Sequence, residues 1–192
     1  MTKPVGAIVL AAGFSTRFGS SKLLARLRSE KTVFQQTIER ISAALPEMVV
    51  VTRPQLVGEL QKLVPETAIQ SFDNADQGMG ASLAFAARQL GDWSGCLICL
   101  GDMPFIETST YRKIAEQLQE TSIVVPTQDG RTGNPVAFSS NYFSELSKLD
   151  GDSGAKRLIE SHPEAVQRLP VDDPGILQDI DTQAELARFQ GS

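Results

Sequence analysis

The sequence predicts one α/β domain with a mostly parallel sheet and a small antiparallel part, spanning residues 1–192. Strand-like apolar runs alternate with amphipathic helical patterns along nearly the whole chain, which is typical of βαβ units. The 192 residues, 41% of them apolar, can bury one substantial core. The continuously apolar run Gly95–Leu100 indicates a central strand buried on both faces.

The first half of the chain begins with an expected strand at Val5–Leu10, which a glycine-bearing loop follows. Apolar residues then recur at spacings of three and four, so a helix is expected over Thr32–Leu45, before Pro46. In the rest of this half we expect strands at Met48–Thr52 and Ala68–Phe72 and helices at Gln55–Val64 and Ala81–Leu90. A polar loop at Asp73–Gly80 precedes the last of these helices.

The second half is expected to continue with a helix at Thr108–Glu120 and a strand at Ser122–Thr127. The segment Asp129–Gly133 predicts a hairpin turn into an antiparallel strand at Pro135–Phe138. The last expected elements are helices at Tyr142–Leu149 and Gly154–Ser161, strands at Val166–Val171 and Ile176–Ile180, and a helix after Thr182, whose spacing to Glu185 is that of a capping box.

The loop at residues 10–22 has the composition of a phosphate-binding loop. Gly13 and Gly19 allow close approach and unusual backbone angles, while Arg17 and Lys22 supply fixed positive charge. Residues 1–31 contain six basic side chains and one acidic side chain, whereas the remaining chain contains 12 basic and 22 acidic ones. The charge pattern therefore predicts a local anion site within an acidic protein.

Composition also argues against several classes of protein. A nucleic-acid binder would more often show a basic stripe with interleaved aromatic residues, and this chain has one Trp and two Tyr far apart. Cys96 and Cys99 lie three apart on an expected strand and so face opposite sides, which favours buried thiols in a reducing compartment. No apolar stretch is long enough to span a bilayer, so we expect a cytoplasmic protein without a membrane partner.

Two aspartates are candidate ligands for Mg²⁺. Asp102 and Asp181 each follow an expected strand, and ligands bind at the carboxyl ends of strands in open parallel sheets. Magnesium takes one or two protein carboxylates together with phosphate oxygens and water. Asp179 would share a strand face with Asp181 and is the alternative second ligand. Purely structural roles remain open, because Asp102 also suits a turn and Asp181 a helix N-terminus.

Other polar residues have a structural and a functional interpretation. Ser82 either caps the helix after Gly78 or binds the nucleoside. Asp152 and Ser153 either cap the next helix or receive an anionic acceptor substrate. His162 stands at an expected helix end, where a histidine interacts with the helix dipole.

Together these segments resemble the nucleotidyltransferases of molybdenum-cofactor biosynthesis, in particular the molybdopterin cytidylyltransferases. The match runs almost end to end, and its specificity comes from the number and order of the motifs. In chain order the motifs are Leu10–Gly13 with Arg17, Gly19 and Lys22, then Gly78–Leu83, Leu100–Pro104, Gly133–Val136, Gly151–Lys156 and Asp179–Thr182.

The resemblance implies a Rossmann-like, three-layer nucleotidyltransferase fold. It implies Mg²⁺-dependent transfer of CMP from CTP to the terminal phosphate of molybdopterin, with or without bound molybdenum, and release of pyrophosphate. The catalytic residues would be Arg17, Lys22 and Asp102, and Mg²⁺ would lie on Asp102 and Asp181. The remaining residues are assigned to nucleotide binding, at Leu10, Ala11, Ala12, Gly13, Gly78 and Ser82, and to the acceptor, at Gly133, Asn134, Asp152 and Ser153.

The resemblance leaves the substrates partly open. Guanylyl-transferring members carry glycine where this chain has Ala12, so the alanine favours CTP. Cytidylyltransferases often have other residues at Met103 and Asn134, which leaves the acceptor less defined than the reaction. Alternatives are a sugar-phosphate nucleotidyltransferase and a non-catalytic nucleotide sensor, and a molybdoenzyme chaperone as delivery partner stays open.

Overall fold

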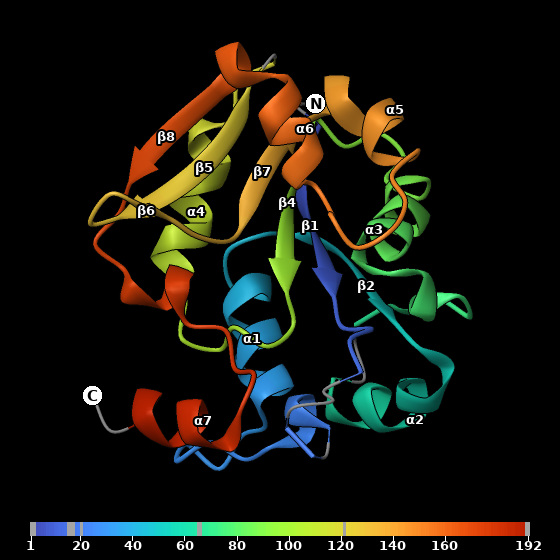
Figure 1. Ribbon diagram of the computed structural model, residues 1–192, viewed down its shortest axis with the longest axis vertical. Helices are drawn as coiled ribbons and strands as arrows, with labels where there is room; N and C mark the ends of the chain where they lie inside the picture. Colours follow the sequence, from blue (N-terminus) through green and yellow to red (C-terminus); the bar gives the residue numbers. More distant parts are fainter. Residues whose placement is uncertain (1–2, 15–17, 20, 65–66, 121, 191–192) are drawn as a thin grey trace.

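The computed structural model describes residues 3–14, 18–19, 21–64, 67–120 and 122–190, which form one mixed sheet covered by helices (Figure 1). The strands are β1 Val5–Leu10, β2 Glu47–Thr52, β3 Ile69–Ser71, β4 Gly95–Leu100, β5 Ile123–Gln128, β6 Arg131–Thr132, β7 Val136–Ser139 and β8 Val166–Pro170. The α-helices are α1 Val33–Ser42, α2 Pro54–Leu63, α3 Met79–Ala87, α4 Thr108–Gln117, α5 Phe143–Leu146, α6 Lys156–Ser161 and α7 Gln183–Phe189.

The strand order confirms the predicted α/β class. The sheet runs β3-β2-β1-β4-β7-β5-β6, and β8 pairs with β5. β1 lies parallel between β2 and β4, and β2 continues the parallel part to β3. β7, the expected antiparallel strand, is antiparallel to β4 and β5, and β6, which lies within the expected turn, pairs antiparallel with β5. Within the described sheet, the antiparallel pairing is therefore confined to β5, β6 and β7 and the edge of β4 that faces β7, while β1 and β4 are parallel to each other.

Two hydrophobic clusters cover the two faces of the sheet and make the fold three-layered. One cluster contains buried residues of α1, α2 and α4, and the other contains buried residues of α3, α5 and α6. Cys99 belongs to the first cluster and Cys96 to the second, so the two thiols do face opposite sides of β4. Burial raises the pKa of both thiols far above the usual value, which leaves them inert packing groups.

A smaller cluster attaches the C-terminal helix to the N-terminal part of the chain. Ile180 is fully buried with Phe18, Leu27 and Val33, and partly buried residues of α7 pack against them. In Figure 1, α7 lies at the end of the molecule towards which β1 and β4 point. The last described segment therefore reaches the edge of the sheet where ligands bind in this class of fold.

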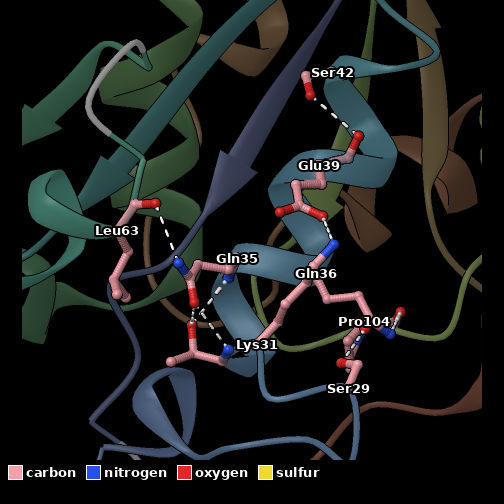
Figure 2. A network of polar contacts seen from close by, with 9 residues as sticks. Ser29, Lys31, Gln35, Gln36, Glu39, Ser42, Leu63 and Pro104 are labelled. Carbon is pink, nitrogen blue, oxygen red and sulfur yellow. Dashed lines mark hydrogen bonds and ion pairs between the residues drawn. The ribbon is translucent and has the colours of Figure 1, made fainter.

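Side chains of α1 hold two neighbouring connections in place (Figure 2). The helix begins with a capping box between Thr32 and Gln35, and the Gln35 amide also donates to the Leu63 carbonyl at 3.4 Å. Gln36 donates to the Pro104 carbonyl at 3.0 Å, which fixes the loop after β4. Lys31, which precedes the helix, forms an ion pair with Glu39 of α1.

The expected strand at Ile176–Ile180 is wrong. The chain forms a 3-10 helix at Pro174–Leu177 there and continues without pairing to the described part of the sheet. Asp173 caps this turn by accepting from the Gly175 amide at 2.9 Å, and a Cβ on Gly175 would lie 2.5 Å from the Phe105 backbone. The apolar residues that suggest a strand are buried in a turn packed against the loop after β4.

Other boundaries differ by a few residues. α3 begins two residues earlier than expected, and the expected helix Tyr142–Leu149 is a 3-10 turn at Ser140–Tyr142 followed by the short α5. α6 begins at Lys156, two residues after the expected start. Among the described residues, no helix is both long enough and apolar enough to cross a membrane.

Replacing the buried Asp173 should destabilise the fold. Its carboxylate also accepts from the Glu107 amide at 2.9 Å and the Thr110 hydroxyl at 2.6 Å. Asp173→Ala leaves the buried Thr110 hydroxyl and the partly buried Glu107 amide without this partner, so the free energy of unfolding should fall by about 3 kcal/mol in chemical denaturation. The exposed neighbour offers a matched control, Asp172→Ala, and equal effects of the two substitutions would contradict this role.

Candidate active site

A cavity of about 460 Å³ opens at the carboxyl ends of β1 and β4. It is lined by the loop after β1, by the start of α3, by the ends of β4 and its loop, and by the segment before α7. The lining residues are Leu10, Ala11, Ala12, Gly13, Phe14, Lys22, Leu23, Ala75, Asp76, Gly78, Met79, Ser82, Leu100, Asp102, Asp152, Asp179 and Asp181.

Hydrogen bonds to both neighbouring strands fix the start of the loop after β1. The Ala11 amide donates to the Val51 carbonyl at 2.8 Å, and the buried Thr52 hydroxyl donates to the Ala11 carbonyl at 2.8 Å. On the other side, the Gly101 amide donates to the Leu10 carbonyl at 2.9 Å. The first residues of the predicted phosphate loop are therefore held as a continuation of β1.

Lys22 joins the two candidate metal ligands. Its Nζ lies 2.5 Å from Asp102 Oδ2 and 2.7 Å from Asp181 Oδ1. The Lys22 side chain is 11% exposed, and those of Asp102 and Asp181 are 17% and 31% exposed. Two carboxylates that are 79 residues apart in the sequence therefore face the same nitrogen atom on one side of the cavity.

The segment before Asp181 is not a β-strand, and a backbone hydrogen bond places it beside Asp102. The Ile180 amide donates to the Asp102 carbonyl at 3.1 Å, and the Ile180 side chain is fully buried. The predicted capping box is confirmed, because Thr182 and Glu185 bond each other's amides at the start of α7. One buried side chain between two aspartates, followed by a cap, thus fixes Asp179 and Asp181 at the cavity.

Burial and charge act against each other in this cluster. Burial raises the pKa of the Asp102 carboxyl, the contact with Lys22 opposes that effect, and the charge of Asp179 adds to it. Burial lowers the pKa of Lys22, but the attraction and hydrogen bonds of Asp102 and Asp181 outweigh it, so its pKa lies above the usual value. Lys22 is therefore positively charged at neutral pH.

The donor atoms of this cluster fit a hard divalent cation. Asp102 Oδ1 is buried and has no hydrogen-bond partner among the described residues. A buried carboxylate oxygen without a hydrogen-bond partner costs free energy unless a ligand binds it. The part of the chain that the structure describes contains no group of three or more His, Cys, Asp or Glu side chains arranged for a metal. Two carboxylates suffice for Mg²⁺ when phosphate oxygens and water fill the other positions.

The start of α3 is packed against the segment that carries Asp152. Gly78 has φ +102°, and a Cβ there would lie 2.4 Å from Asp152 Oδ1. A Cβ on Gly80 would lie 2.4 Å from the Asp150 carbonyl oxygen, and the Gly80 amide donates to the Gly151 carbonyl at 2.7 Å. Both glycines are thus needed for the close approach that brings Asp152 to the cavity.

Most residues that the sequence assigned to the nucleotide and the metal line this cavity. The exception is Arg17, which lies outside the described residues. Of the acceptor candidates, Asp152 lines the cavity, whereas Gly133, Asn134 and Ser153 are not among its lining residues. Gly133 and Asn134 pack on the turn after β8, where the Asn134 amide donates to the Ile176 carbonyl at 3.0 Å. Their acceptor role stays a prediction.

Sequence reasoning missed two exposed, large hydrophobic residues at the cavity. Phe14 and Met79 are the large hydrophobic side chains that are exposed in the described part of the chain, at 52% and 45%, and both line the cavity. The Arg53 guanidinium lies 4.8 Å from the centre of the Phe14 ring. Each residue lies within a motif that we singled out for its glycines and charged residues. Nothing in the sequence pointed separately to the Phe14 or Met79 side chain.

Comparison with known proteins identifies the family. The model of the MobA-like NTP transferase domain matches residues 7–166, so the chain belongs to this family of nucleotidyltransferases. The purine catabolism protein PucB of Bacillus subtilis is 29% identical over 93% of this chain and 92% of its own length. A relative from Thermococcus sibiricus, named as a molybdenum cofactor guanylyltransferase, is 26% identical over 96% of this chain and 97% of its own.

Solved structures agree with this family in fold. Rv0371c of Mycobacterium tuberculosis superposes with a TM-score of 0.89 and 28% identity over the full length of both chains. A second structure of that protein is a complex with manganese, at a TM-score of 0.84 and 25% identity, again over the full length of both chains. The class of protein is thus a nucleotidyltransferase, as the resemblance of the motifs predicted.

Alanine substitutions at two helical glycines should have opposite effects on stability, because only one of the glycines is closely packed against another segment. Gly58 in α2 has open space where a Cβ would stand, so Gly58→Ala should raise the free energy of unfolding by about 1 kcal/mol. Gly80→Ala should lower it by about 2 kcal/mol because the methyl group collides with the Asp150 backbone. Chemical denaturation of both variants measures the difference, and stabilisation by Gly80→Ala would contradict the close packing of this segment.

Proposed function

We propose that this protein transfers CMP from CTP to the terminal phosphate of molybdopterin, with release of pyrophosphate and dependence on Mg²⁺. The observation that carries the proposal is the cluster of Lys22, Asp102 and Asp181 in one cavity with the loop after β1. Family membership supports nucleotidyl transfer as the reaction type. The manganese complex of a structural relative supports the use of a divalent cation.

The reaction needs alignment and charge neutralisation more than proton transfer. A phosphate oxygen of the acceptor, already anionic, would form a bond to the α-phosphorus of CTP while the bond to the pyrophosphate oxygen breaks. Lys22, with Arg17 as the expected second cation, would neutralise the charge that accumulates on the departing pyrophosphate. A divalent cation held by Asp102 and Asp181 would supply Lewis acidity and further neutralisation at the phosphates.

The choice of CTP rests on Ala12, which lines the cavity and is 7% exposed. Its methyl group narrows the space that a nucleobase can use, which favours the smaller pyrimidine. GMP transfer is the second candidate, because several relatives of similar length are named as molybdenum cofactor guanylyltransferases. The two candidates share the reaction and the acceptor and differ only in the base.

Release of pyrophosphate with each of the four nucleoside triphosphates tests the proposal. We expect release with CTP and Mg²⁺ when molybdopterin is present, and little release without it. Release with CTP and a sugar phosphate, but not with molybdopterin, would contradict the acceptor and favour a sugar-phosphate nucleotidyltransferase. Nucleotide binding without release under any condition would contradict the enzyme and favour a nucleotide sensor.

Removing one metal ligand should abolish most of the activity. Asp102→Asn keeps the shape of the side chain but removes its charge, and turnover at saturating Mg²⁺ should fall by about 100-fold or more. Asp92, which is exposed and pairs with Lys3, provides the control Asp92→Asn. Near-normal turnover of Asp102→Asn, measured as pyrophosphate release by folded protein, would contradict the assignment.

Ala12→Gly should relax the choice of base. The substitution removes the methyl group at the cavity wall, and one methyl group is worth about 1–3 kcal/mol in such a pocket. The ratio of kcat/KM for CTP to that for GTP should therefore fall by about tenfold, measured under identical Mg²⁺ conditions. An unchanged ratio would remove Ala12 as the residue that discriminates between the bases.

A further inference from the structure

The two candidate metal ligands already bind a cation, which is the ammonium group of Lys22. Its Nζ lies at 2.5 Å from Asp102 and 2.7 Å from Asp181, and both are short contacts between opposite charges. The contacting oxygens belong to the same two carboxylates that would hold the divalent cation. Lys22 and that cation therefore compete for the same negative charge.

We propose that Lys22 suppresses metal binding in the nucleotide-free protein and releases the two aspartates only when a nucleoside triphosphate offers it replacement anionic oxygens. Lys22 would thus couple the metal and nucleotide sites, in addition to its role at the phosphates. This inference rests on the proposed function only for the assignment of a divalent cation to Asp102 and Asp181.

The burial of Lys22 makes the coupling strong. The side chain is 11% exposed, so it has little access to water that could stabilise its charge once it leaves the carboxylates. A buried charge that loses its partner is costly. A divalent cation that displaced Lys22 from Asp102 and Asp181 would remove two of its anionic contacts, whereas a triphosphate in the same cavity would offer the ammonium replacement oxygens.

The other described charged side chains of the cavity are acidic, which also makes the charge of Lys22 important for metal binding. Asp76, Asp152 and Asp179 also line the cavity, so Lys22 is the one cationic side chain among its described lining residues. The acidic lining draws divalent cations towards the site. Without Lys22, Asp102 and Asp181 would lose the positive charge that competes with such a cation. By linkage, metal and nucleotide should each tighten the binding of the other.

Binding of Mn²⁺ to the nucleotide-free full-length chain tests the proposal, with free Mn²⁺ measured by electron paramagnetic resonance. We expect Lys22→Met, which keeps length but removes charge, to bind Mn²⁺ about tenfold or more tightly than the unsubstituted protein. Lys22→Arg keeps the charge and should remain within about twofold of the unsubstituted protein. Lys31→Met removes an exposed lysine paired with Glu39 and should have no effect.

Several outcomes would overturn the proposal. Equal or weaker Mn²⁺ binding by Lys22→Met would do so, and so would equal tightening by Lys22→Arg, because charge would then not be the cause. Tight Mn²⁺ binding by Lys22→Met that survives an added Asp102→Asn substitution would place the metal elsewhere. No step of this experiment needs turnover, so failure of the proposed reaction would appear separately, as absent pyrophosphate release.

A second measurement on the unsubstituted protein covers the case in which Lys22→Met does not fold. The ¹⁵N resonance of the Lys22 ammonium, identified by its loss in Lys22→Arg, should be unchanged by Mg²⁺ alone at a concentration that saturates the protein when CTP is present. It should shift when Mg²⁺ and CTP are added together. A full shift with Mg²⁺ alone would contradict the coupling.

Discussion

The contact of Lys22 with Asp102 and Asp181 joins three segments that are far apart in the chain. Lys22 follows β1, Asp102 follows β4, and Asp181 precedes α7. Charged groups with so little exposure require partners, and Lys22 stabilises both carboxylates while they stabilise its ammonium group. The architecture of the cavity depends on this arrangement, because it decides which carboxylates face the space where a ligand binds.

Much of the surrounding packing serves to hold these segments in place. Ile180 is fully buried and its amide bonds the Asp102 carbonyl, which sets Asp181 at the correct depth. Asp173 binds the start of α4 to the turn that precedes Ile180. On the opposite wall, Gly80 allows the segment with Asp152 to reach the cavity. Residues outside the cavity thus determine where its charges stand.

The fold and most of the site could be predicted because local signals were strong. Apolar runs marked the strands, and the motif around Gly13 and Lys22 marked the loop after β1. The expected strand at Ile176–Ile180 was wrong because buried apolar residues have no clear period in a short segment, and the cap at Asp173 decides the turn. The direct contact of Lys22 with both aspartates could not be predicted, since it depends on tertiary packing.

In the arrangement that we propose, Asp102 and Asp181 hold a divalent cation, and Lys22 moves from these carboxylates to the phosphates of the nucleotide. Crystals grown with CTP and Mn²⁺ would locate both groups, because the metal can be identified by anomalous scattering. If this arrangement is correct, the anomalous peak lies in contact with Asp102 and Asp181, and Lys22 binds phosphate oxygens. A peak remote from these carboxylates, or Lys22 still between them beside a bound nucleotide, would contradict it.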